Sequence, residues 1–169
     1  MAEWAFWGCV PFLAVALYTD TRSMRIPNWL TVSALLSGLL VHGAVDGLQG
    51  LLIAGVGAAA GFAVLLVLHV TGAVGAGDVK LFAGIGAWTG TLFTLQVVVY
   101  SVLIGALIGW VIVLRRKETG RRIRTIFGRL TGILLLRSAG LRGGDEAELL
   151  KFPFMVAVLP GSVCAYLYY

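Results

Sequence analysis

The sequence predicts an all-α membrane protein, a polytopic bundle of about six transmembrane helices, and three observations support this prediction. Of the 169 residues, 59% are hydrophobic and 12% are charged, and the mean hydropathy is +0.95. Soluble domains contain about 45 to 50% apolar and about 25% charged residues. The apolar runs are long and do not alternate with a period of two residues, which favours helices. A bilayer accepts only folds that satisfy every backbone hydrogen bond internally, and helices do so.

The apolar runs divide into six candidate spans. A helix needs roughly 20 residues to cross the hydrocarbon core. The 36 residues from Val79 to Leu114 would form a helix of about 54 Å, far longer than a core of about 30 Å. We therefore expect a break at "WTGT", residues 88–91. The predicted spans are residues 3–19, 29–45, 51–71, 79–93, 95–114 and 152–169.

The basic residues predict the orientation of the bundle. If the spans alternate, all 13 Lys and Arg residues fall on one side, which the positive-inside rule makes cytoplasmic. Both termini then face outward, and we expect a multi-pass protein of the cytoplasmic (inner) membrane, with a bacterial or an archaeal source left open by the residues. The segment at about 115–151 is basic and cytoplasmic, and within it residues 121–137 have the periodicity of an amphipathic helix lying on the inner leaflet. We treat 1–169 as a single membrane-embedded domain and, because Glu3 leads the first apolar run, expect no cleaved signal peptide.

Several functional classes are disfavoured by composition and spacing. The net charge of +5 belongs to topology determinants near anionic lipid, so we do not expect nucleic-acid binding. Cys9 and Cys164 lie in different spans without a CxxC pair, which indicates neither a zinc module nor a disulfide framework. We expect no metal and no cofactor. His42 and His69 are interpreted as helix-end or packing residues.

Two acidic residues, Asp20 and Asp78, lie at the cytoplasmic ends of predicted spans and at a similar depth. An ionisable group near the membrane is costly, so a function is the default hypothesis. Alone, each has a simpler explanation: Asp20 would end its helix in solvent, and Asp78 would be an N-cap after the glycines. As a close pair, they would share one proton. The ionised member would activate water, and the protonated member would polarise a carbonyl, which is peptide hydrolysis without a metal.

Neighbouring residues suggest how the two acids are presented. Gly72, Gly75 and Gly77 permit positive φ and carry no Cβ, so a substrate backbone could approach Asp78 closely. Small residues four apart predict close helix packing, within the chain or in a dimer. These spacings are Gly57 to Gly61, Gly86 to Gly90 and Gly105 to Gly109.

The polar residues beside each acid have two possible roles, one structural and one in the function of the acid pair. Pro27 disfavours helix in the residue before it, and Asn28 is expected to cap a helix beginning at Trp29. Arg22 and Lys80 are candidates for tuning the acid pair, holding lipid phosphate or contacting substrate. Anchoring on the cytoplasmic side explains them equally well.

The order of three motifs resembles the prepilin peptidases, membrane aspartic proteases with a GxGD signature. The motifs are Asp20-x-Arg22-x-x-x-Ile26-Pro27-Asn28, Gly75-Ala76-Gly77-Asp78-Val79-Lys80-Leu81, and "FPFMVAVLPG" at 152–161. The resemblance covers essentially the whole chain and is greatest to the compact form that serves tight-adherence (Flp-type) pili. It implies removal of a short basic leader from prepilin-like substrates, with Asp20 and Asp78 as the catalytic pair.

The resemblance also bears on a second activity. Larger members of the family carry a cysteine-bearing cytosolic segment near the first span and methylate the new N-terminus. This sequence passes from the first span to Asp20 without such an insertion. We therefore expect neither N-methyltransferase activity nor a need for S-adenosylmethionine.

Other functions are left open by the residues. Carboxylates in a glycine-broken bundle also suit a proton- or cation-coupled transporter, although here both acids lie at one rim. A non-catalytic assembly subunit would not need Asp20 or Asp78. Within the peptidases, a preflagellin peptidase is the nearest alternative. Apart from substrate and lipid, no partner is predicted, and the oligomeric state is open.

Overall fold

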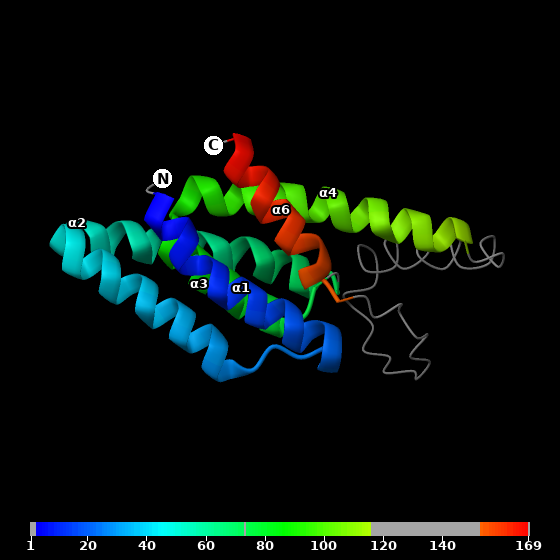
Figure 1. The fold of residues 1–169 in the computed structure, drawn as a ribbon, viewed down its shortest axis with the longest axis horizontal. Helices are drawn as coiled ribbons and strands as arrows, with labels where there is room; N and C mark the ends of the chain where they lie inside the picture. The colour runs from blue at the N-terminus through cyan, green and yellow to red at the C-terminus, as the bar shows by residue number, and fades with distance from the viewer. Residues whose placement is uncertain (1–2, 73, 116–152, 169) are drawn as a thin grey trace, which may run out of the picture. The chain divides into compact units, whose positions relative to one another are not determined.

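The computed structural model describes residues 3–72, 74–115 and 153–168, and the regular structure within these ranges is helical (Figure 1). For residues 113–115 it describes the backbone alone. The prediction of an all-α fold is confirmed for the described part of the chain. The helices are α1 (Glu3–Ser23), α2 (Asn28–Val70), α3 (Ala76–Thr89), α4 (Thr91–Arg115) and α6 (Met155–Tyr168).

The chain divides into two compact units, and the single domain over 1–169 stays a prediction. One unit comprises residues 1–105 and 152–169, and the other comprises residues 106–151. We call the first the main unit, and all that follows concerns it. The predicted amphipathic helix at 121–137 lies outside the described residues, as does the rest of the basic segment from residue 116 to 151.

Glycines with positive φ mark the breaks that the sequence predicted. Gly47 (φ 61°, ψ −141°) is non-helical and divides α2 into two arms, between the predicted spans 29–45 and 51–71. Gly90 (φ 77°) separates α3 from α4, within the predicted break at 88–91. Both predictions are confirmed, and glycine suits these positions because positive φ costs it little.

The apolar helices fit a membrane protein. Among the described residues, Asn28–Val70 and Thr91–Ile112 are long and apolar enough to cross a bilayer, and Met155–Tyr168 is a shorter apolar helix. Large hydrophobic side chains such as Leu40 and Leu103 lie exposed on α2 and α4, as expected for a surface in contact with lipid. The number of spans and their orientation stay predictions.

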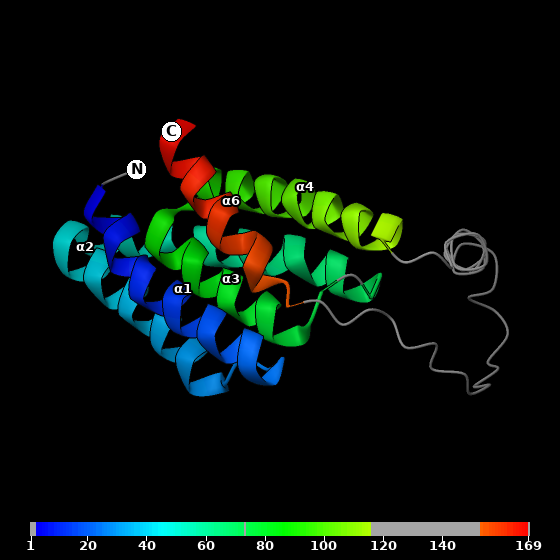
Figure 2. The ribbon, with the colours of Figure 1, turned by 45° about the vertical axis from the view of Figure 1, so that its right-hand side comes forward.

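Helix α3 forms the centre of the main unit and packs against α1 and α2 (Figure 2). Its contact with α2 is very close, because a Cβ on Gly57 would overlap the carbonyl oxygen of Gly86 and a Cβ on Gly61 would overlap that of Phe82. The predicted close packing is thus confirmed for Gly57, Gly61 and Gly86. Gly90, in contrast, has no neighbour at the position of a Cβ.

Trp88 fixes the C-terminal end of α3. Its indole Nε1–H donates a hydrogen bond of 3.0 Å to the carbonyl oxygen of Ala34 in α2. Its ring lies against Gly8 of α1, where a Cβ would overlap the ring. With this end held by two neighbouring helices, the N-terminal end of α3, which carries Asp78, has a defined position.

Candidate active site

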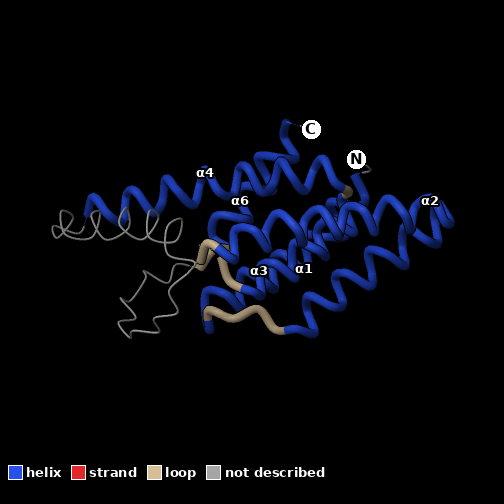
Figure 3. The backbone as a smooth tube through the Cα atoms, turned by 180° about the vertical axis from the view of Figure 1, so that it is seen from behind, coloured by secondary structure: helices blue, strands red, loops and turns tan. Residues whose placement is uncertain are grey.

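Asp20 and Asp78 lie at the same end of the main unit, on different helices. Asp20 is in the last turns of α1 and Asp78 is in the first turn of α3. Figure 3 shows the connections that follow α1 and precede α3 together at that end. Both residues are buried, each with 7% of its surface exposed, and the negative charge of Asp20 acts on Asp78. The structure therefore brings the two predicted acids into electrostatic contact.

Asp78 is held by its own turn of helix. Its Oδ2 accepts a hydrogen bond of 3.1 Å from the N–H of Gly75. Gly75 is the N-cap of α3, with φ −75° and ψ 153°, so the prediction that Asp78 itself is the N-cap is wrong by three residues. Its carboxylate reaches back to the cap, which is the arrangement of an acid in a capping box. The other oxygen, Oδ1, is buried and has no partner among the described residues.

Asp20 is held by a distant part of the chain. The expectation that it ends its helix in solvent is wrong, since α1 continues to Ser23 and Asp20 is buried. Its Oδ2 accepts a hydrogen bond of 3.1 Å from the backbone N–H of Met155, the first residue of α6. The first amides of a helix have no partner within the helix, so the carboxylate of Asp20 satisfies one of them. Met155 is itself fully buried.

The two carboxyls lie just beyond the predicted spans 3–19 and 79–93, and their surroundings shift the pKa of each. Burial, and then the negative charge of Asp20, raise the pKa of Asp78 to about 6, although the N–H of Gly75 and the charge of His69 act to lower it. Burial also raises the pKa of Asp20, while the N–H of Met155 acts to lower it. Neighbouring carboxyls titrate as a pair, and the burial of both favours keeping a proton on the pair.

The glycines of the GxGD motif act by their lack of a Cβ more than by positive φ. In the connection to α3, Gly72 has φ 79°, but Gly75 is extended and Gly77 lies within α3. The expectation of positive φ is therefore wrong for Gly75 and Gly77. A Cβ on Gly77 would lie 3.1 Å from the Cβ of Ile26, so glycine there lets the connection between α1 and α2 lie directly against α3.

The other predicted residues have contacts outside the acid pair. The expected cap by Asn28 is wrong, because α2 begins at Asn28, Pro27 is its N-cap and no side-chain cap forms. Instead, Asn28 Oδ1 accepts a hydrogen bond of 2.9 Å from Lys80 Nζ, which joins the starts of α2 and α3. Arg22 Nη1 donates to the hydroxyl of Tyr18 at 2.6 Å, and its guanidinium lies over the same ring.

A cavity of about 480 Å³ lies at the connection between α1 and α2, next to the helix end that carries Asp20. The residues that line it come from both sides of the connection: Thr19, Ser23, Arg25, Ile26, Pro27 and Asn28. It offers polar groups beside apolar ones.

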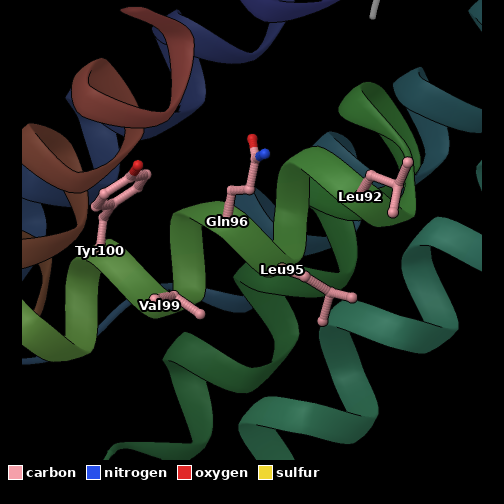
Figure 4. A pocket seen from close by; sticks show the side chains of 5 residues that line it. All are labelled: Leu92, Leu95, Gln96, Val99 and Tyr100. Atoms are coloured by element: carbon pink, nitrogen blue, oxygen red, sulfur yellow. The ribbon is translucent and has the colours of Figure 1, made fainter. Parts of the chain in front are cut away.

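A second cavity, of about 400 Å³, lies along α4 and is lined by Leu92, Leu95, Gln96, Val99 and Tyr100 (Figure 4). It contains no acidic side chain, although Gln96 Oε1 is buried and has no partner among the described residues. We therefore place the candidate active site at the acid pair and not at this cavity.

Sequence reasoning missed two residues of the site. Met155 acts through its backbone amide, which no residue pattern reports, although it lies in the motif "FPFMVAVLPG". His69 was interpreted as a helix-end residue, and it does lie in the last turn of α2. Its Nδ1 also lies 2.8 Å from the carbonyl oxygen of Val74, directly before Gly75. A histidine six residues before a GxGD motif would have been the signal.

Comparisons with known proteins agree on one family. Residues 7–110, which include both acids, match the sequence model of the type IV leader peptidase family. Three relatives carry the name prepilin leader peptidase/N-methyltransferase. That of Bacillus subtilis is 33% identical over 94% of this chain and 53% of its own length. Those of Pectobacterium carotovorum (35%) and Aeromonas hydrophila (36%) match over 72% and 63% of this chain, and over 46% and 39% of their own lengths. The chain thus spans about half the length, or less, of these curated relatives, and no solved structure matches it significantly.

Proposed function

The chain belongs to the type IV leader peptidase family, and from this premise we propose that it is a membrane aspartic endopeptidase for prepilin-like precursors. Its substrates would be pilins of the tight-adherence (Flp) type, from which it would remove the short basic leader at the cytoplasmic face. One observation carries the proposal, namely two buried aspartates from α1 and α3 that interact at one end of the main unit. The names of the relatives support the same substrate class.

The surroundings of the two carboxyls support a division of labour in hydrolysis. Ionised Asp20 takes a proton from water, and the resulting hydroxide oxygen bonds to the carbonyl carbon of the scissile peptide. Protonated Asp78 donates a hydrogen bond to the carbonyl oxygen, which takes up the developing negative charge. Asp20 then delivers the proton that it took from water to the amide nitrogen, and the C–N bond breaks. Asp20 is again ionised, Asp78 keeps its proton, and the pair holds one proton as before. Asp78 Oδ1, which is buried and has no partner within the described ranges of the chain, suits the contact with the carbonyl.

We propose peptidase activity without methylation. Helix α1 runs without interruption from Glu3 to Ser23 and carries Asp20 itself, so within α1 no cysteine-bearing segment separates the apolar residues from this acid. The relatives' names include N-methyltransferase, and the mass of the processed substrate distinguishes the two outcomes. A mature N-terminus that is one methyl group heavier than the free amine would contradict this part of the proposal.

The test is co-expression with a Flp-type prepilin and mass measurement of the pilin N-terminus. Asp20→Asn and Asp78→Asn remove the ionisable groups while nearly preserving shape. Each should reduce the rate of leader removal by at least about a thousandfold, the scale of loss seen when a catalytic residue is removed. The amount of inserted protein should be unchanged.

Asp46→Asn is the matched control. Asp46 is also an aspartate in a helix, but its side chain is 56% exposed and lies near His42, away from the acid pair. This variant should process the prepilin at the normal rate. Normal processing by both Asp20→Asn and Asp78→Asn would overturn the proposed function.

A further inference from the structure

His69 is linked to Asp78 through a single peptide group. Nδ1 of His69 lies 2.8 Å from the carbonyl oxygen of Val74. A carbonyl oxygen only accepts hydrogen bonds, so Nδ1 carries the hydrogen and donates it. The N–H of the same peptide group, that of Gly75, donates to Asp78 Oδ2 at 3.1 Å. One amide plane therefore accepts from the histidine on one edge and donates to the aspartate on the other.

Such an arrangement fixes the plane of the peptide group. The Val74–Gly75 peptide lies in the connection between α2 and α3, outside both helices, so no helical hydrogen-bond ladder holds it. Without the bond from His69, the plane could rotate and turn the Gly75 N–H away from Asp78. In a chain of hydrogen bonds, a donor at the carbonyl also polarises the N–H and strengthens its bond.

We propose that His69 is a positioning residue for Asp78, which it holds through the Val74–Gly75 peptide group. The inference rests on the proposed function, since it assigns His69 to the acid pair of that site. With Oδ2 held in this way, the buried Oδ1, for which the described part of the chain offers no partner, is the oxygen presented to substrate. His69 touches neither water nor substrate in this scheme, so it is not a catalytic residue.

Helix-end stabilisation alone does not explain the contact. A histidine in the last turn of a helix interacts favourably with the helix dipole from a side chain directed at the helix's own carbonyls. His69 instead bonds a carbonyl five residues further along the chain. Among the described residues, the titratable side chains that act on Asp78 are Asp20 from α1, which raises its pKa, and His69 from α2, which lowers it.

The test compares two substitutions at one position. His69→Leu removes the donor together with the imidazole ring, whereas the amide nitrogen of His69→Asn can occupy the place of Nδ1 and keeps the donor alone. His69→Leu should reduce kcat for prepilin cleavage about tenfold or more, the factor expected for loss of one positioning hydrogen bond. KM should change less than kcat. His69→Asn should restore most of kcat.

The pH profile separates positioning from a structural role. His69→Asn removes the electrostatic effect by which His69 lowers the pKa of Asp78, so the alkaline limb of the kcat/KM profile should move to higher pH. A residue needed for folding alone would not move this limb. The measurement uses full-length protein in membranes or detergent with a prepilin substrate.

His42→Leu is the matched control. Nε2 of His42 lies 2.9 Å from the carbonyl oxygen of Trp88, a contact of the same kind at the other end of α3. This substitution should leave kcat and the pH profile unchanged. Wild-type kinetics in His69→Leu, or equal loss of kcat in His69→Leu and His69→Asn, would overturn the inference. Asp78→Asn in the same assay distinguishes this failure from failure of the proposed function, because an active Asp78→Asn overturns the latter.

Discussion

Asp20 lies near the end of α1 and receives its hydrogen bond from α6, whereas Asp78 lies at the start of α3 and receives its bond from three residues away. The separation along the chain is 135 residues in the first case. The orientation of Asp78 is therefore a property of one connection and one helix turn. The orientation of Asp20, in contrast, depends on the packing of α6 against α1. The two helices are in contact.

The difference teaches that a two-acid site does not need two equivalent supports. A carboxylate held by backbone amides at a helix N-terminus is stabilised in its ionised form. Both acids accept such an amide, Asp20 from the start of α6 and Asp78 from the cap of α3. The negative charge of Asp20 also raises the pKa of Asp78, whose Oδ1 has no partner among the described residues. Unequal supports favour one acid as base and the other as proton donor.

The largest effect concerns the two acids as a unit. The double variant Asp20→Asn with Asp78→Asn should be no slower than the slower single variant, since residues that act in one step are not additive. Leader removal by the three variants, measured by mass spectrometry over long incubations, checks this. A further thousandfold loss in the double variant would show that the two acids act independently.

The pH dependence of the reaction should follow the shared proton. Activity needs one proton on the pair, and the pKa of Asp78 is raised to about 6. As pH rises through this value, the proton is lost and kcat/KM should fall by about tenfold per pH unit. At low pH, protonation of Asp20 removes the base and the rate should fall again. A rate that still rises well into alkaline pH would contradict the acid pair.

The remote support of Asp20 is removed by Met155→Pro. Proline has no N–H, but it is tolerated at the first position of a helix. Met155→Ala is the control, because it also truncates the buried side chain but keeps the N–H. Relative to this control, Met155→Pro should lower kcat roughly tenfold. Loss of the N–H raises the pKa of Asp20, so the acid limb of the profile should move to higher pH. Identical profiles for the two variants would show that the bond to Met155 does not orient Asp20.

The smallest effect concerns the turn that ends α1. Met24 follows the helix with φ 50°, a left-handed conformation that glycine adopts at less cost. Met24→Gly should stabilise the protein by up to about 1 kcal/mol, seen as a slightly higher unfolding temperature in detergent. Prepilin cleavage and its pH profile should not change, since α6, and not this turn, holds Asp20. A shifted acid limb would show that the turn also orients Asp20.

Much of the fold could be predicted from the sequence because its determinants are local. Long apolar runs require helices in a bilayer, and glycine permits the positive φ at Gly47 and Gly90 that interrupts them. The two acids could be predicted as a pair because a carboxyl at the edge of a membrane is costly without a function. The roles of individual loop residues were predicted less well. Asn28, for example, is of a residue type that often caps helices, but its side chain accepts a hydrogen bond from Lys80 instead.

What the sequence alone determined is the helical class, the two main breaks and the identity of the acids, since each depends on side-chain type within one short stretch. The tertiary structure decided which atoms hold those acids. Met155 and the Val74–Gly75 peptide act through backbone groups, and every residue except proline carries the same N–H. A backbone donor leaves no mark in a sequence, so only the packing of α6 and the course of the connection before α3 could reveal it.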